Sequence, residues 1–195
     1  MHGQPGCNID EDITALRQRC RCYQLGALSA VLWLSSAALA VEQSPAALRA
    51  AYLYQITKFA SWPDDLLPAA APIRICFVGA EVTQVSRIFA DSTAARVIGG
   101  HPLHSERYED WLQLRASLRK EPCHLVVAGT GEPGLVADER QHTLLIGFEQ
   151  RWLKHGGMLA LIQDGERINI TVNRDQLELS RVRLEARFLR LAKGG

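Results

Sequence analysis

The chain has 195 residues, of which 47% are hydrophobic and 22% are charged. That length accommodates one domain with a terminal extension, and it leaves no room for two sizeable hydrophobic cores. The 22 Lys and Arg residues nearly balance the 21 Asp and Glu residues. This balance excludes a strongly basic nucleic-acid-binding protein, so no nucleic-acid partner is expected.

The N-terminal part of the chain has the pattern of a secretory signal peptide. A cluster of arginines precedes an uncharged apolar run over residues 25–41, which ends with small residues at Ala38 and Ala40. A basic region, an apolar region and an Ala-x-Ala site in this order are typical of export and cleavage. We therefore expect residues 1–40 to be an N-terminal extension with a signal peptide and residues 41–195 to form a single exported domain. The apolar run is at the short limit for spanning a bilayer, so an uncleaved anchor is the alternative.

Cleavage after Ala40 would leave Cys76 and Cys123 as the remaining two of five cysteines. An even number of cysteines in an oxidising compartment favours a disulfide. Both residues belong to apolar segments typical of strands, and neighbouring strands lie about 4.8 Å apart, within reach of a disulfide. We therefore predict a Cys76–Cys123 bond, with two buried free thiols as the alternative.

The first half of the expected domain alternates helical and strand patterns. Ser44 is a suitable N-cap and Pro45 a suitable first residue for a helix that extends to about Ala60. Its large apolar residues recur at helical spacing and predict one buried face: Leu48, Tyr52, Ile56 and Phe59. Residues 73–78 form an apolar β-rich run that predicts a strand, and residues 82–90 have helical spacing.

Short strands and helices continue to alternate after this point. Residues 97–108 predict a weaker strand with a break at Gly99 and Gly100, and residues 111–118 predict a surface helix. Two further apolar runs, 123–128 and 143–148, predict strands. This alternation favours an α/β fold, with a layered, largely parallel sheet flanked by helices.

The C-terminal third of the chain has a different pattern. Two strand-like segments, residues 158–163 and 166–172, flank Asp164 and Gly165, which suit a tight hairpin turn. The last segment, residues 177–191, combines spaced apolar residues with arginines. We therefore expect a C-terminal β-hairpin followed by a terminal helix.

No set of residues has the spacing of a catalytic, cofactor or metal site. Residues 129–134 match G-x-G-x-x-G after a predicted strand, but Pro133 and the few residues before Gln141 leave no room for the helix of a dinucleotide site. The histidines lack the spacing of metal ligands, and no serine lies in a G-x-S-x-G turn. We therefore expect no cofactor, no metal and no catalytic residue. A hydrolase would need an acid–base cluster that only folding assembles.

The expected domain resembles the YfiR family in five segments that occur in the same order. They are LRAAYLYQITKFASWP (48–63), PIRICFVG (72–79), CHLVVAG (123–129), GGMLALIQDGERINITVN (156–173) and RLEARFLRLA (183–192). The resemblance implies a periplasmic α/β protein that represses an inner-membrane diguanylate cyclase by binding its periplasmic sensor region. It also implies a second partner, an outer-membrane lipoprotein that can sequester the repressor. In the family the positions of Cys76 and Cys123 are disulfide-bonded, whereas a further cysteine pair of some members is absent near residues 147–154.

A binding protein of this kind needs residues that carry the energy of an interface. Aromatic residues and arginine dominate such sites, which makes Trp62, Trp152, Arg187 and Phe188 the candidates for partner binding. The alternative is that the aromatic rings pack in the core and that Arg187 lies on a solvated face. A homodimer and a small-ligand site near Gly79 and Gly129, at the carboxyl ends of two strands, are further alternatives.

Overall fold

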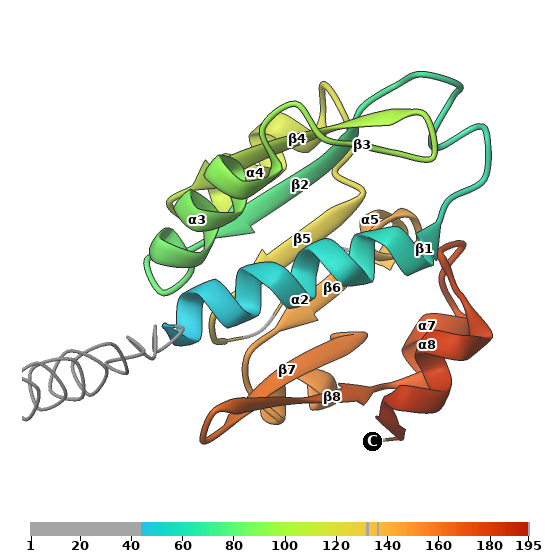
Figure 1. Cartoon of the computed structure of the whole chain (residues 1–195). Helices are drawn as coiled ribbons and strands as arrows, with labels where there is room; N and C mark the ends of the chain where they lie inside the picture. The colour runs from blue at the N-terminus through green and yellow to red at the C-terminus, as the bar shows by residue number, and fades with distance from the viewer. Residues whose placement is uncertain (1–43, 132, 136, 195) are drawn as a thin grey trace, which may run out of the picture. The chain divides into compact units, whose positions relative to one another are not determined.

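The computed structural model describes residues 44–131, 133–135 and 137–194 (Figure 1). The expected signal peptide and its cleavage site lie outside these residues. Across the described ranges, no helix combines the length and apolar character that crossing a membrane requires.

A mostly parallel sheet forms the centre of the fold. Its strands are β2 (Ile73–Val78), β3 (Val97–Ile98), β4 (His101–Tyr108), β5 (Leu125–Ala128), β6 (Leu144–Gly147), β7 (Leu159–Asp164), β8 (Arg167–Val172) and β10 (Lys193–Gly194). Within the described residues their order is β10-β8-β7-β6-β5-β2-β4-β3. Strands β4, β2, β5, β6 and β7, which are neighbours in this order, run parallel to one another. Strand β3 pairs antiparallel with β4, and β8 pairs antiparallel with β7. The largely parallel sheet predicted from the sequence is therefore confirmed.

The central strands are covered on both faces. Every residue of β2, β5 and β6 is buried, which explains why these strands are continuous apolar runs rather than alternating ones. The helices are α2 (Pro45–Phe59), α3 (Thr83–Thr93), α4 (Trp111–Leu118), α5 (Ala137–His142), α6 (Arg151–Lys154), α7 (Arg174–Glu178) and α8 (Ala186–Leu191). Helices α2 and α3 lie side by side on one face, in front of the sheet in Figure 1.

The two faces of the sheet carry different side chains. On the α3 side, the ring of Phe77 in β2 lies 5.6 Å from that of Phe89. On the opposite face, the Tyr108 hydroxyl oxygen lies 2.8 Å from the Oγ atom of Ser117 in α4. Since alternate strand residues point to opposite faces, β2 and β4 contribute to both layers.

Helix α2 begins where the sequence predicts, but its buried face differs in part from the expected one. The Ser44 hydroxyl accepts a hydrogen bond from the backbone N–H three residues later, at 3.2 Å. Of the predicted apolar face only Ile56 is fully buried, and the other three residues are partly buried. The buried face also includes Leu53 and the two small residues Ala46 and Ala50, which let this helix approach its neighbours closely.

The C-terminal part confirms the hairpin and divides the terminal amphipathic segment. Strands β7 and β8 pair antiparallel across Gly165, which has a φ of +57°. The segment 177–191 contains the end of α7, the short strand β9 (Arg183–Leu184) and α8. Strand β9 pairs with β1 (Ala60–Ser61), and the backbone N–H of Glu185 donates to the Phe59 carbonyl at 3.0 Å. This pairing with the end of α2 overrides the helical spacing of the segment.

Candidate functional site

A disulfide connects two neighbouring strands at the centre of the fold. Cys76 in β2 and Cys123, just before β5, are bonded with their Cα atoms 6.0 Å apart. Both side chains are fully buried. The bond closes a loop across 47 residues, which by loop-closure entropy stabilises the fold by about 4 kcal/mol. The expected Cys76–Cys123 disulfide is therefore present in the structure.

Three of the four residues expected at a partner surface lie in the core. Trp62, Trp152 and Phe188 are 8%, 1% and 3% exposed. The side chain of Arg187 is 64% exposed, pairs with a glutamate two residues earlier and holds its guanidinium 4.7 Å from the ring centre of Phe59. Of this set, only Arg187 offers its side chain to a partner without rearrangement of the core.

Trp152 occupies space that two glycines leave open. A Cβ atom on Gly147 would lie 2.3 Å from the indole, and one on Gly157 would lie 2.1 Å from it. The indole also stacks on Trp111 of α4, with ring centroids 6.4 Å apart. A buried tryptophan thus packs against the segment 147–154, where this sequence lacks the second cysteine pair that some members of the family have.

The glycines of the 129–134 loop leave room for neighbouring side chains. A Cβ atom on Gly129 would lie 2.4 Å from Glu81, and one on Gly134 would lie 2.4 Å from Trp111. The side chain of Glu81 also lies against Gly79. Close packing therefore accounts for Gly129 and Gly134, and Glu81 occupies the position near Gly79 and Gly129 where the sequence suggests a ligand crevice.

Strand β2 carries a buried arginine whose role was not predicted from the sequence. Arg74 is 6% exposed, and its Nη2 atom lies 3.0 Å from the Oε2 atom of Glu106 in β4. Its Nη1 atom donates to the Glu121 carbonyl at 2.7 Å. The hydroxyl of Tyr108 donates to the same Glu106 carboxylate. The available signal was a single arginine inside the otherwise apolar run of residues 73–78.

The contacts of Glu106 keep its carboxylate charged. The hydrogen bond from Tyr108, together with His104 and Arg74, lowers the pKa of Glu106 to about 2, although burial acts in the opposite direction. Burial and the hydrogen bond to Glu106 raise the pKa of Tyr108. The network therefore connects β2, β4 and α4 through paired charges, while the buried Nε atom of Arg74 has no hydrogen-bond partner among the described residues.

His124 holds the segment before β2 against the sheet. Its Nδ1 atom accepts a hydrogen bond from the backbone N–H of Arg74, and its Nε2 atom donates to the Leu66 carbonyl, each at 3.0 Å. The ring meets Trp62 edge-on, with centroids 5.4 Å apart. Burial lowers the pKa of His124, which fits a neutral ring with its proton on Nε2.

A hollow of about 350 Å³ lies beside this segment. Its lining residues are Ser61, Trp62, Pro63, Arg181 and Arg183. Asp65 receives two hydrogen bonds from Arg181, at 2.7 and 2.8 Å. The Nε1 atom of Trp62 is buried and has no hydrogen-bond partner among the described residues. The hollow thus brings an indole beside two arginines, of which Arg181 is already paired with Asp65 and Arg183 could face a small planar anion.

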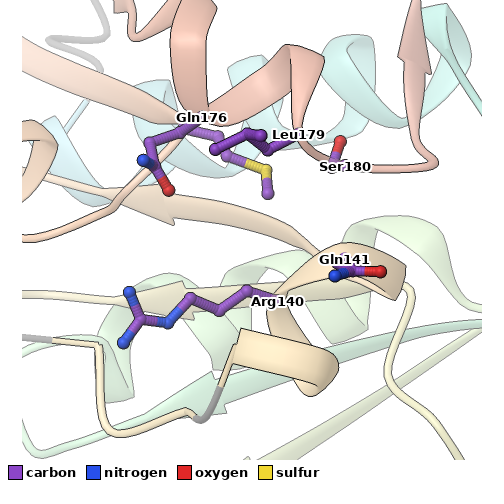
Figure 2. A pocket seen from close by; sticks show the side chains of 6 residues that line it. Arg140, Gln141, Gln176, Leu179 and Ser180 are labelled. Carbon is purple, nitrogen blue, oxygen red and sulfur yellow. The ribbon is translucent and has the colours of Figure 1, made fainter.

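A second hollow, of about 170 Å³, lies between α5 and the end of α7 (Figure 2). Arg140 and Gln141 line one side, and Gln176, Leu179 and Ser180 line the other. The side chain of Arg140 lies against Gly156, and its Nε atom donates to the Leu135 carbonyl. In the part of the chain that the structure describes, no group of three or more His, Cys, Asp or Glu residues could hold a metal ion.

The fold and these contacts define a disulfide-linked α/β domain with small hollows and a buried arginine paired with Glu106. Residues 46–193 match the YfiR/HmsC-like family, and the chain belongs to this family. Members of the family are periplasmic regulators rather than enzymes. No curated protein matches the chain.

Proposed function

We propose that this protein is an exported repressor that binds the periplasmic sensor region of an inner-membrane diguanylate cyclase. The observation that carries the proposal is the family match over residues 46–193, which spans nearly the whole described domain. Such a repressor needs a rigid scaffold, and the fully buried Cys76–Cys123 bond supports one. Binding would lower the synthesis of cyclic-di-GMP on the other side of the membrane.

The proposed repression works by a population shift. A protein that binds one conformation of the sensor region more tightly than another favours that conformation by the difference in binding free energy. The repressor therefore has to prefer the inactive sensor. An outer-membrane lipoprotein that sequesters the repressor would restore cyclase activity by lowering the free repressor concentration.

Co-expression with the cyclase encoded nearest to this gene tests the proposal. We expect cellular cyclic-di-GMP to fall, and the purified protein to capture the cyclase's periplasmic region in a pull-down. Among the four candidate residues, Arg187→Ala is the informative variant, because Trp62, Trp152 and Phe188 are buried and their loss disturbs folding. Arg190→Ala, which removes another exposed arginine of α8, is the matched control. Unchanged cyclic-di-GMP and no capture by the wild-type protein would overturn the proposal.

A second candidate function is the binding of a small ligand, and the hollow beside Trp62 favours it. The indole and the guanidinium group of Arg183 suit a planar carboxylate, whereas the guanidinium of Arg181 is already paired with Asp65. Thermal unfolding with benzoate, without any protein partner, is the test. We expect a raised midpoint that Arg183→Ala abolishes and Arg167→Ala, on the exposed start of β8, retains. An unchanged wild-type midpoint at millimolar benzoate would argue against this function.

A further inference from the structure

The edge strand β4 leaves backbone groups without a partner. It pairs with β2 along residues 103–108, but β3 covers only the first two residues of β4. The backbone N–H of Gly79 donates to the Tyr108 carbonyl at 3.1 Å, so the backbone groups of Tyr108 face the β2 side. In a parallel pair these directions alternate along the strand. The backbone groups of Ser105 and Arg107 therefore point away from the sheet.

A hydrogen bond at the start of this edge supports the same alternation. The backbone N–H of Leu103 donates outward to the Arg96 carbonyl at 3.1 Å. Ser105 follows Leu103 by two residues and therefore has the same orientation. Within residues 44–131, 133–135 and 137–194, no backbone group pairs with the outer side of Ser105 or Arg107. An open edge of this kind is a template for another extended chain.

A hollow of about 190 Å³ lies beside this edge, between β4 and α3. Helix α3 contributes Ser86 and Arg87, and β4 contributes Ser105 and Arg107. Both arginines are exposed, and neither forms an ion pair with a carboxylate of the described chain. The acid that borders the hollow, Glu106, is already bound by Tyr108 and Arg74 on the other face.

We propose that the β4 edge binds an extended, acidic peptide segment of a partner protein, which adds a strand to the sheet. The backbone groups of Ser105 and Arg107 would form the strand-to-strand hydrogen bonds. Carboxylates on alternate residues of the peptide would face Arg87 and Arg107, since charge-assisted bonds to guanidinium are strong. A basic peptide would meet two like charges and be rejected. The proposal goes beyond the proposed function, because it specifies the chemistry of the bound segment and does not depend on a cyclase.

Two kinds of variant separate the contribution of backbone hydrogen bonds to peptide binding from the contribution of the arginine charges. Ser105→Pro removes an N–H that the described fold does not use, and proline is tolerated where the N–H of an edge strand faces solvent. Ser105→Ala retains the N–H and is its control. The double variant R87E/R107E reverses the charge beside the edge. Arg115→Glu makes the same kind of change on α4, which covers the opposite face of the sheet.

The probe is a short synthetic peptide that alternates aspartate with valine, compared with its lysine analogue. NMR titration of the isotope-labelled protein gives the affinity, and amide exchange reports the backbone groups directly. We expect the aspartate peptide to slow exchange at Ser105 and Arg107. Ser105→Pro and R87E/R107E should each weaken its binding at least about tenfold, whereas Ser105→Ala and Arg115→Glu should change it by less than about twofold.

The double charge variant should also prefer the lysine peptide, and the affinity of the wild-type protein should fall as salt is added. Equal binding of the two peptides by the wild-type protein, or no slowing of exchange at Ser105 and Arg107, would overturn the proposal. A folded Ser105→Pro protein that binds like the wild type would do the same. If Ser105→Pro does not fold, the exchange data and the charge variants still decide the question.

Discussion

The imidazole of His124 accepts a hydrogen bond from the backbone N–H of Arg74 at 3.0 Å, across 50 residues of sequence. Its other ring nitrogen donates to the Leu66 carbonyl, so both nitrogens are used. A protonated imidazole has no acceptor, and a second proton would therefore break the bond to Arg74. Among the described residues, the charges of Arg74 on β2 and His101 on β4 also oppose its protonation and lower its pKa, after the larger effect of burial.

The first prediction concerns the stability of the protein below neutral pH. Burial lowers the pKa of His124 below its ordinary value of 6.5, so the unfolded chain binds this proton more readily than the folded one. The stabilisation from neutral His124 is complete above pH 6.5 and is lost as the pH falls toward the folded pKa. Urea unfolding at several pH values between about 7.5 and 5 measures the decline.

His124→Asn is the matched variant for this prediction, because an asparagine oxygen can accept near the Nδ1 position and does not titrate. We expect its free energy of unfolding to depend less on pH over this range. Glu106 does not interfere, since its pKa of about 2 places its effect between pH 4.5 and 2. Identical pH dependence of the two proteins would show that His124 does not carry the effect.

The second prediction concerns the hydrogen bond between Tyr108 and Glu106. Because this bond is the largest cause of the low pKa of Glu106, Tyr108→Phe should raise that pKa from about 2 toward the ordinary 4.5. The stabilisation from Glu106 is present above pH 4.5 and is lost as the pH falls toward 2, so the variant should lose less stability on acidification. Titration of the Glu106 carboxyl by carbon-13 NMR gives the value. Ser117→Ala, which leaves the Tyr108–Glu106 bond in place, should change it less.

The third prediction concerns the disulfide. Replacing both Cys76 and Cys123 by alanine should lower the free energy of unfolding by up to about 4 kcal/mol, because the unfolded chain gains the freedom of an open 47-residue loop. Refolding the wild-type protein in a reductant should lower its thermal midpoint similarly. The double-alanine variant should not respond to the reductant. An unchanged midpoint, with both thiols shown by mass spectrometry to be reduced, would contradict the prediction.

The fourth prediction concerns the packing of Trp152. A Cβ atom on Gly157 would lie 2.1 Å from the indole, so Gly157→Ala should destabilise the fold by about 1–3 kcal/mol through overpacking. Chemical denaturation measures this cost. In the double variant G157A/W152L the smaller side chain relieves the contact, and the combined cost should be less than the sum of the two single costs. Additive costs would mean that the glycine and the indole do not compete for the same space.

The arrangement of the candidate sites followed only in part from the sequence. The Cys76–Cys123 bond was predictable, because it needs only two cysteines and the strands that carry them. The hollow beside Trp62 was not predictable, since the pairing of β9 with β1 brings Arg181 and Arg183 to it. The Arg74–Glu106 ion pair was not predictable either, because it joins two strands that are separated by a helix in the sequence.

The sequence by itself determined the α/β class, the N-cap at Ser44 and the hairpin at Gly165. These features depend on the residue periodicity and turn chemistry of short segments, which act within a few residues. Only the tertiary structure decided that Trp62, Trp152 and Phe188 are buried and that Arg187 is exposed. Aromatic residues occur both in protein cores and at interfaces. Whether a given ring is buried or exposed depends on the elements that pack over it after folding.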